Sequence, residues 1–264
     1  MNNDLQVLIV TMNQKNYQLL DKMNIQSDAL VGNQTDENNV EEFEYKSNKV
    51  RWFSFNERGV GLNRNNLLMR ATSDIILFAD DDVVYDDGYK DKVLEAFKKH
   101  PEAQMILFNV IPMPRTINPY LITKYKRIRW YNCLKYGAVR IAVRLSALRE
   151  SNVYYSLLFG GGTKFYSGED SLFLMDCIKK GMKVYAYPET IGKVYFGSSS
   201  WFEGFNDKYF KDKGIFFYFL SKRFSKLLCL QYCIRCKRNF IKHCSPKQAY
   251  KLMIEGIKEF KKGN

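Results

Sequence analysis

The feature of this chain that most constrains its fold is an apolar run that ends in three adjacent aspartates. Ile75–Ala79 is wholly apolar, and Asp80, Asp81 and Asp82 follow it directly. A short apolar run with polar ends is typical of a strand buried on both faces of a parallel sheet. Comparable runs alternate with helical patterns through the first half of the chain, so we expect βαβ units and an α/β fold.

The remaining elements are predicted from the same alternation. Strands are expected at 5–11, 28–31, 50–53, 74–79, 103–110 and 184–187, and helices at 17–23, 62–71, 88–99 and 171–180. The last strand should end at Pro188, because proline cannot donate a hydrogen bond to a neighbouring strand. From about Glu203 onward the sequence predicts basic helices.

Three neighbouring carboxylates at a strand end need a physical reason, because they repel one another and burial strengthens the repulsion. In open α/β sheets, ligands bind at the carboxyl ends of the strands. Mg²⁺ or Mn²⁺ would relieve the repulsion, since both ions prefer carboxylate and phosphate oxygens. The alternative is a solvated turn before a helix whose start carries Asp86 and Asp87.

Two further motifs place this aspartate cluster in a known context. Gly61-Leu-Asn-Arg-Asn65 lies on a helix before the strand, and Gly168-Glu-Asp170 precedes a later helix. In this order the motifs resemble the donor-site block and the "ED" motif of family 2 glycosyltransferases with the GT-A fold. The resemblance covers residues 5–190 and implies a Rossmann-like, nucleotide-diphospho-sugar transferase fold: a mixed sheet flanked by helices, here with a basic helical C-terminal extension.

The resemblance also implies roles for the acidic residues. Asp82 would ligate the metal directly, Asp80 would approach the metal or the ribose, and Asp81 holds the variable middle position beside the donor. Asp170 would be the general base that takes the proton of the acceptor hydroxyl, so that direct attack inverts the configuration at C1. Glu169 would contact the acceptor or brace the loop. The alternative is that Ser167-x-x-Asp170 is a capping box.

The rest of the donor site is expected from the ends of the first two strands and from the helix before the aspartates: Thr11, Asn13, Asn33, Gln34, Arg64 and Asn65. The family usually has acidic residues where Asn33 and Gln34 stand, and amides can also pair with a pyrimidine edge. Arg64 and Asn65 would reach the pyrophosphate or brace the aspartate loop. For Arg64 the alternative is an exposed charge on a helix.

Two glycines and two tryptophans are candidates for binding the acceptor sugar. Gly161 and Gly162 would let the backbone approach a sugar closely, and Trp130 and Trp201 offer rings for sugar stacking. A flexible loop and a buried tryptophan are the alternatives. The family's later histidine ligand is absent from 193–200, and there is no Q-x-x-R-W motif, so we expect transfer of a single sugar rather than processive synthesis.

The formal net charge of +13 is unevenly distributed. Residues 115–149 contribute +9 and residues 211–264 contribute +11, so the remainder is slightly acidic. The first block would suit a glycan or lipid-linked saccharide acceptor. The second suits an amphipathic helix on an anionic membrane surface; the alternative is helices that pack on the domain with a solvated basic face. No nucleic-acid-binding motif accompanies the charge.

These observations predict a glycosyltransferase domain at 1–202, with a donor half at 1–111 and an acceptor half at 112–202, and a basic helical extension at 203–264. No leader sequence is visible, so we expect a cytoplasmic protein, peripheral on a membrane if the basic helices bind lipid. We expect an inverting enzyme that moves one sugar, with a UDP-sugar as donor, in polysaccharide or glycoconjugate biosynthesis. The alternatives are a nucleotidyltransferase and a non-catalytic binding module. The six cysteines are expected to be free thiols.

Overall fold

The structure is a computed structural model that describes residues 4–113, 120–195 and 204–263. It consists of two compact units. The sheet unit comprises Met1–Leu157 and Glu169–Ser198, and the helical unit comprises Leu158–Gly168 and Ser199–Asn264. The loop before residue 169 therefore belongs with the C-terminal helices although it interrupts the sheet unit in sequence.

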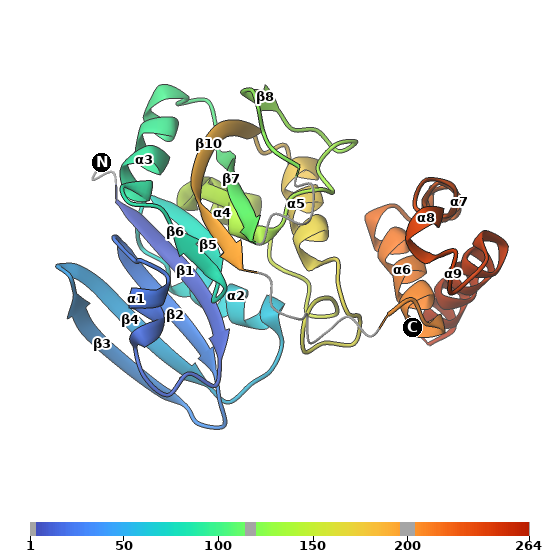
Figure 1. Ribbon diagram of the computed structural model, residues 1–264, viewed down its shortest axis with the longest axis horizontal. Coiled ribbons are helices and arrows are strands. Elements are labelled where there is room, and N and C mark those ends of the chain that lie inside the picture. Colours follow the sequence, from blue (N-terminus) through green and yellow to red (C-terminus); the bar gives the residue numbers. More distant parts are fainter. Residues whose placement is uncertain (1–3, 114–119, 196–203, 264) are drawn as a thin grey trace. The chain divides into compact units, whose positions relative to one another are not determined.

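The sheet unit is built on one mixed sheet with the strand order β3-β4-β2-β1-β5-β9-β7-β10-β6, and β8 pairs with β10 (Figure 1). Strands β4, β2, β1 and β5 run parallel, whereas β9 runs antiparallel to both β5 and β7. The strands are β1 (Leu5–Met12), β2 (Asp28–Gln34), β3 (Asn39–Tyr45), β4 (Asn48–Phe55), β5 (Ile75–Asp80), β6 (Val83–Tyr85), β7 (Met105–Met113), β8 (Lys126–Arg127), β9 (Ile141–Arg144) and β10 (Val184–Tyr195).

Helices cover both faces of this sheet, because its central strands are apolar on both sides. The helices are α1 (Gln18–Lys22), α2 (Val60–Arg70), α3 (Tyr89–Lys99), α4 (Leu145–Ser151) and α5 (Glu169–Lys179), with a 3-10 turn, η1 (Ala138–Arg140). Val7 and Ile9 of β1 share one buried cluster with residues of α1 and α3. On β5, Phe78 instead packs edge-on against Phe173 of α5 and Tyr155.

Most predicted elements are confirmed, and two differences have clear causes. Strand β3 was not predicted, because its sequence Asn-Val-Glu-Glu-Phe-Glu-Tyr carries three acids and lies at an exposed sheet edge. Strand β10 does not end at Pro188 as expected but continues to Tyr195. The pairing of β10 with β7 shifts register between Ala186 and Thr190, so Pro188 lies in a bulge where its missing N–H costs no ladder bond.

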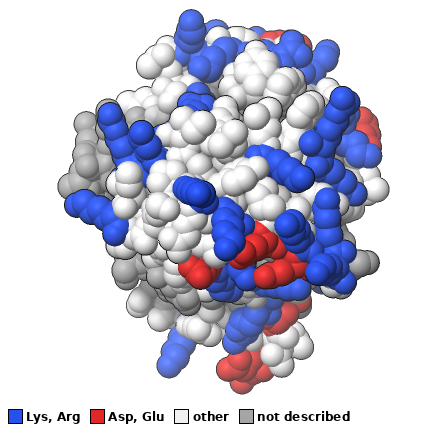
Figure 2. Space-filling view, turned by 90° about the vertical axis from the view of Figure 1, so that its right-hand side faces the viewer, with Lys and Arg blue, Asp and Glu red and all other residues white. Residues whose placement is uncertain are grey.

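The helical unit contains α6 (Asp207–Leu220), α7 (Ser225–Arg235), α8 (Lys237–Phe240) and α9 (Pro246–Lys262). Helices α6 and α9 pack backbone to backbone: a Cβ on Gly214 would lie 2.1 Å from the Met253 carbonyl oxygen, and one on Gly256 would lie 2.4 Å from that of Lys211. Figure 2 shows one face of the molecule, on which Lys and Arg side chains are spread widely and acidic side chains form a few groups.

The loop of the helical unit adds aromatic side chains to the same core. Phe159 packs edge-on against Phe219 of α6, with ring centroids 5.1 Å apart, and Phe165 packs against Phe260 of α9 at 6.0 Å. Every helix in the described ranges is too short or too polar to cross a bilayer.

Candidate active site

The aspartate cluster lies where the sequence predicts it, at the carboxyl end of β5. Asp80 is the last residue of β5 and is in register with Val10 of β1. Thr11, the next residue of β1, donates a hydrogen bond from Oγ1 to Oδ2 of Asp81 at 2.5 Å. Asp81 therefore faces the end of β1, and the structure brings the predicted donor residues of β1 and β5 together.

Arg64 connects the two acidic motifs. Its guanidinium donates one hydrogen bond to Oδ1 of Asp80 and another to Oδ1 of Asp170, each 2.7 Å long. The side chain is only 3% exposed and lies over the ring of Tyr155, so the alternative of an exposed helix charge is wrong. Burial acts to lower the pKa of this guanidinium, but Asp80 and Asp170 outweigh it and hold the pKa well above its usual value.

Asp170 is held from two sides at the start of α5. Its Oδ1 accepts from Arg64, and its Oδ2 accepts from the backbone N–H of Ala138 at 2.9 Å. Both oxygens thus bind other elements rather than capping the helix of Asp170. Burial, and then the nearby Asp80, raise the pKa of this carboxyl, while Arg64 acts in the opposite direction. A fixed carboxylate with a raised pKa is a suitable general base.

Glu169 lies beside this pair as a second acidic group. Its Oε1 is 3.8 Å from the Arg64 guanidinium. Burial, followed by the charge of Asp170, raises the pKa of Glu169 to about 7. The guanidinium of Arg64 thus lies near three carboxyls, those of Asp80, Asp170 and Glu169.

Asp82 supplies the observation that bears on a metal ion. Burial, and then repulsion from Asp80 and Asp81, raise its pKa to about 6. Its Oδ1 is buried without a hydrogen-bond partner among the described residues. A hard divalent cation would satisfy this oxygen and relieve the repulsion, so the donor set fits Mg²⁺ or Mn²⁺. The described ranges contain no group of three or more His, Cys, Asp or Glu that could hold a metal on its own.

The amides predicted to read the nucleotide hold neighbouring backbone in the structure. The side-chain amide of Asn33 accepts from the backbone N–H of Gln14 at 3.0 Å and donates to its carbonyl at 2.9 Å. Gln34 donates to the carbonyl of Gly59 at 3.0 Å. Asn13 has a φ of 55°, in the left-handed region, and its N–H donates to the carbonyl of Gln34. These residues shape the loop after β1, beside Thr11.

Asn65 has a similar bracing role and points to residues that the sequence did not reveal. Its amide donates to the carbonyl of Tyr155 at 2.9 Å and accepts from the N–H of Tyr155 at 2.8 Å. Tyr155 thereby presents its ring to Arg64. Neither Tyr155 nor Ala138 carries a sequence signal, because one acts through its ring and backbone and the other through an N–H. Asn63, which donates to the carbonyl of Gly32, lies within the quoted motif and could have been found.

The predicted acceptor-side residues fall in different parts of the chain. Trp130 is 66% exposed in the sheet unit, with its ring edge-on to Tyr131. Gly161 and Gly162 belong to the helical unit, and Gly162 has a φ of 77°. Trp201 lies outside the described residues.

Much of the basic block at 115–149 has a structural role. Arg144 donates to the carbonyls of Phe97 and Ala103, and Arg149 donates to the carbonyl of Ala71 at 2.7 Å. Phe97 is in the last turn of α3 and Ala71 is the C-cap of α2, so these arginines satisfy carbonyls at helix ends. The side chains left exposed, and therefore able to meet an acceptor, include Lys124, Arg129 and Lys135.

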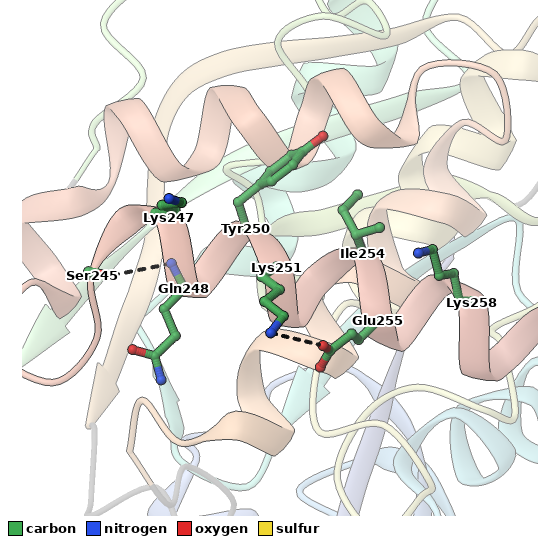
Figure 3. A pocket seen from close by; sticks show the side chains of 8 residues that line it. All are labelled: Ser245, Lys247, Gln248, Tyr250, Lys251, Ile254, Glu255 and Lys258. Atoms are coloured by element: carbon green, nitrogen blue, oxygen red, sulfur yellow. Dashed lines mark hydrogen bonds and ion pairs between the residues drawn. The ribbon is translucent and has the colours of Figure 1, made fainter.

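A shallow hollow of about 590 Å³ lies elsewhere, along α9 of the helical unit. Figure 3 shows that its labelled side chains come from α9 and from Ser245 at its N-cap, and that Lys251 pairs with Glu255 within it. None of the predicted site residues lines this hollow.

Residues 33–151 match the family model for glycosyl transferase family 2. This segment is similar to glycosyl transferase family 2 and makes up a little under half of the chain. It contains Arg64, β5 and all three aspartates, whereas Asp170 lies beyond its end. The ion pair between Arg64 and Asp170 therefore connects the matched glycosyltransferase segment to a carboxylate outside it.

Solved structures of S. aureus TarS share this fold. TarS 1–349 in complex with UDP has a TM-score of 0.65 at 12% identity, covering 96% of this chain and 81% of that chain. TarS 1–349 in complex with UDP-GlcNAc has a TM-score of 0.62 at 14% identity, covering 94% and 75%. At such identities the likeness shows the fold alone, and it confirms the predicted GT-A architecture. No curated protein sequence matches the chain.

Proposed function

We propose that this chain is an inverting glycosyltransferase that moves one sugar from a nucleotide-diphosphate sugar to a saccharide acceptor. The observation that carries the proposal is the Arg64 bridge, which holds the donor-side carboxylate of Asp80 and the candidate base Asp170 through bonds of 2.7 Å. A transferase of this kind needs a donor site and a proton acceptor at a fixed separation, and one buried side chain connects the two here.

The donor that we propose is a UDP-sugar. The support is the likeness of the fold to TarS structures that contain UDP-GlcNAc and UDP, together with the family match. Asp82 and Asp80 would hold Mg²⁺ or Mn²⁺ as the D-x-D motif. Such an ion would stabilise the negative charge that develops on the departing diphosphate. Thr11 positions Asp81 beside them, and the loop shaped by Asn13, Asn33 and Gln34 would receive the nucleotide.

The chain's own residues account for the proton in the reaction. The acceptor hydroxyl attacks C1 of the sugar while the C1–O bond to the diphosphate breaks, and Asp170 takes the hydroxyl proton. Arg64 and the Ala138 N–H orient the Asp170 carboxylate for this step. Attack opposite to the leaving group inverts the anomeric configuration. Glu169 would contact the acceptor, and because its pKa is raised to about 7 it could donate a hydrogen bond there when protonated.

The acceptor that we propose is a glycan or a lipid-linked saccharide in polysaccharide or glycoconjugate synthesis. Exposed Lys124, Arg129 and Lys135 of the sheet unit, together with Trp130, are suited to an acceptor with phosphate groups. A lipid-linked acceptor also requires access to a membrane. We therefore propose a cytoplasmic enzyme that is peripheral on an anionic membrane surface through the extension at 203–264, and no nucleic-acid partner.

The decisive test is a product assay with a panel of nucleotide sugars, with and without Mn²⁺. We expect one UDP-sugar to raise the melting temperature in the presence of Mn²⁺ and UDP to be released when acceptor is added. Release of pyrophosphate would instead identify a nucleotidyltransferase. Donor binding without any release by the wild type would identify a non-catalytic binding module, and the absence of stabilisation by every nucleotide sugar would reject the proposal.

A further inference from the structure

Helix α7 (Ser225–Arg235) has an unusual division of its two faces. The residues that it buries against the rest of the helical unit are small, namely Ser225, Cys229 and Cys233, spaced four apart. Three of its four large aliphatic residues are exposed on the opposite face: Leu227 is 61% exposed, Leu230 45% and Ile234 63%, whereas Leu228 is half-buried. A surface helix of a globular protein ordinarily buries its large apolar side chains.

The segments on either side of α7 in sequence carry further exposed apolar residues. Phe224, immediately before α7, is 53% exposed, and Ile241, after α8, is 55% exposed. Leu227, Leu230 and Ile234 share one face of α7, and exposed apolar residues grouped in this way mark a site that meets a partner or a membrane, whereas single exposed apolar residues need no explanation. The stripe therefore requires an occupant.

The charge around the stripe indicates what that occupant is. At 100° per residue, Lys226 and Arg235 fall on opposite flanks of the Leu227–Ile234 stripe, and both are exposed. No Asp or Glu occurs anywhere in residues 213–254, which contain ten Lys and Arg.

We infer that the outward face of α7 lies in the headgroup region of an anionic lipid bilayer. Leu227, Leu230 and Ile234 would enter the boundary with the acyl chains, and the flanking Lys226 and Arg235 would pair with lipid phosphates. Two copies of this face would bring like charges together, and nucleic acid would leave the aliphatic stripe in water. An anionic bilayer matches both the apolar stripe and its basic borders.

This inference deepens the proposed membrane partner and rests on it, but it is independent of sugar transfer. The test uses the full chain without donor or acceptor, so that failure of vesicle binding and failure of catalysis are separate results. The protein is sedimented with vesicles of phosphatidylcholine alone, and with vesicles that also contain phosphatidylglycerol. We expect binding to the anionic vesicles that weakens as salt is added, because surface charges are screened over about 8 Å at physiological ionic strength.

Two double variants, each with a matched control, test separately how the apolar stripe and the basic residues beside it contribute to vesicle binding. Leu227→Gln with Ile234→Gln should weaken binding to anionic vesicles by about tenfold or more, whereas Val40→Gln with Met69→Gln, at 56% and 58% exposure in the sheet unit, should not. Lys226→Gln with Arg235→Gln should weaken binding by about fivefold per residue and reduce the salt dependence. Lys98→Gln with Lys99→Gln, on exposed positions of α3, is the charge-matched control.

All four variants change exposed residues, and an unchanged melting temperature verifies that each one folds. The inference is overturned if the wild type binds neither kind of vesicle, or if the stripe variant binds as tightly as the wild type. It is also overturned if the wild type forms a dimer that the stripe variant dissociates, since the occupant would then be a second copy of the chain. Preferential binding of single-stranded DNA over anionic vesicles would likewise reject it.

Discussion

The carboxylate cluster of the sheet unit and helix α7 of the helical unit use the same kinds of residue in opposite ways. In the cluster, Arg64 is 3% exposed and its guanidinium is shared between Asp80 and Asp170. On α7, basic residues are exposed with few acidic residues nearby in sequence, and aliphatic residues face outward. A buried charge fixes the geometry of its partners, whereas exposed charge beside exposed apolar surface recognises something outside the chain.

The largest effect that we predict tests the buried side of this comparison. Arg64→Gln removes the partner of two carboxylates, and breaking a buried ion pair from one side costs about 3–5 kcal/mol of unfolding free energy. Urea denaturation measures the loss. The control is Arg58→Gln, because the Arg58–Asp36 pair is exposed on both sides and such pairs contribute at most about 1 kcal/mol. Equal losses for the two variants would contradict the role assigned to Arg64.

The next effect is on the rate. Asp170→Asn keeps the shape of the side chain but removes its ability to take a proton, so kcat should fall by about a hundredfold to a thousandfold while donor affinity is unchanged. Single-turnover release of UDP and donor titration measure the two quantities. Asp176→Asn on the same helix removes an exposed carboxylate that pairs with Lys179, and its kcat should match that of the wild type. A variant at position 170 that retains full kcat would show that the base lies elsewhere.

The third prediction concerns pH. The pKa of Glu169 is raised from the usual 4.5 to about 7 by burial and then by Asp170, so the folded state binds this proton more tightly than the unfolded state does. The stability from Glu169 is fully present below pH 4.5 and is lost as the pH rises through 7. Glu169→Gln should remove this loss. Between pH 4 and pH 8, its unfolding free energy should therefore rise by about 2 kcal/mol relative to that of the wild type.

Unfolding titrations from pH 4 to 8 without divalent ions measure this difference. Glu150→Gln, at an exposed position of α4, is the control. If the unfolding free energies of the wild type and Glu169→Gln change with pH in the same way, the pKa of Glu169 is not raised in the folded state.

The sequence predicted the strands and the motifs of the site more completely than it predicted the contacts between them. Apolar runs such as Ile75–Ala79 identify central strands, because burial on both faces selects apolar residues at every position. The edge strand β3 was not predicted, since an exposed edge does not require an apolar pattern. The bond from Arg64 to Asp170 spans 106 residues in sequence, and only the folding of the sheet decides that these two side chains meet.

The smallest effect that we predict refines the comparison within the basic block at 115–149. Arg144 is half-buried and donates to the carbonyls of Phe97 and Ala103, so Arg144→Gln should cost about 1 kcal/mol of unfolding free energy without changing the acceptor KM. Exposed Lys135 should behave in the opposite way: Lys135→Gln leaves stability unchanged and raises the acceptor KM. Denaturation and kinetics on both variants therefore distinguish the structural charges of this block from those that meet the acceptor, and a shared effect of the two variants would show that this division is wrong.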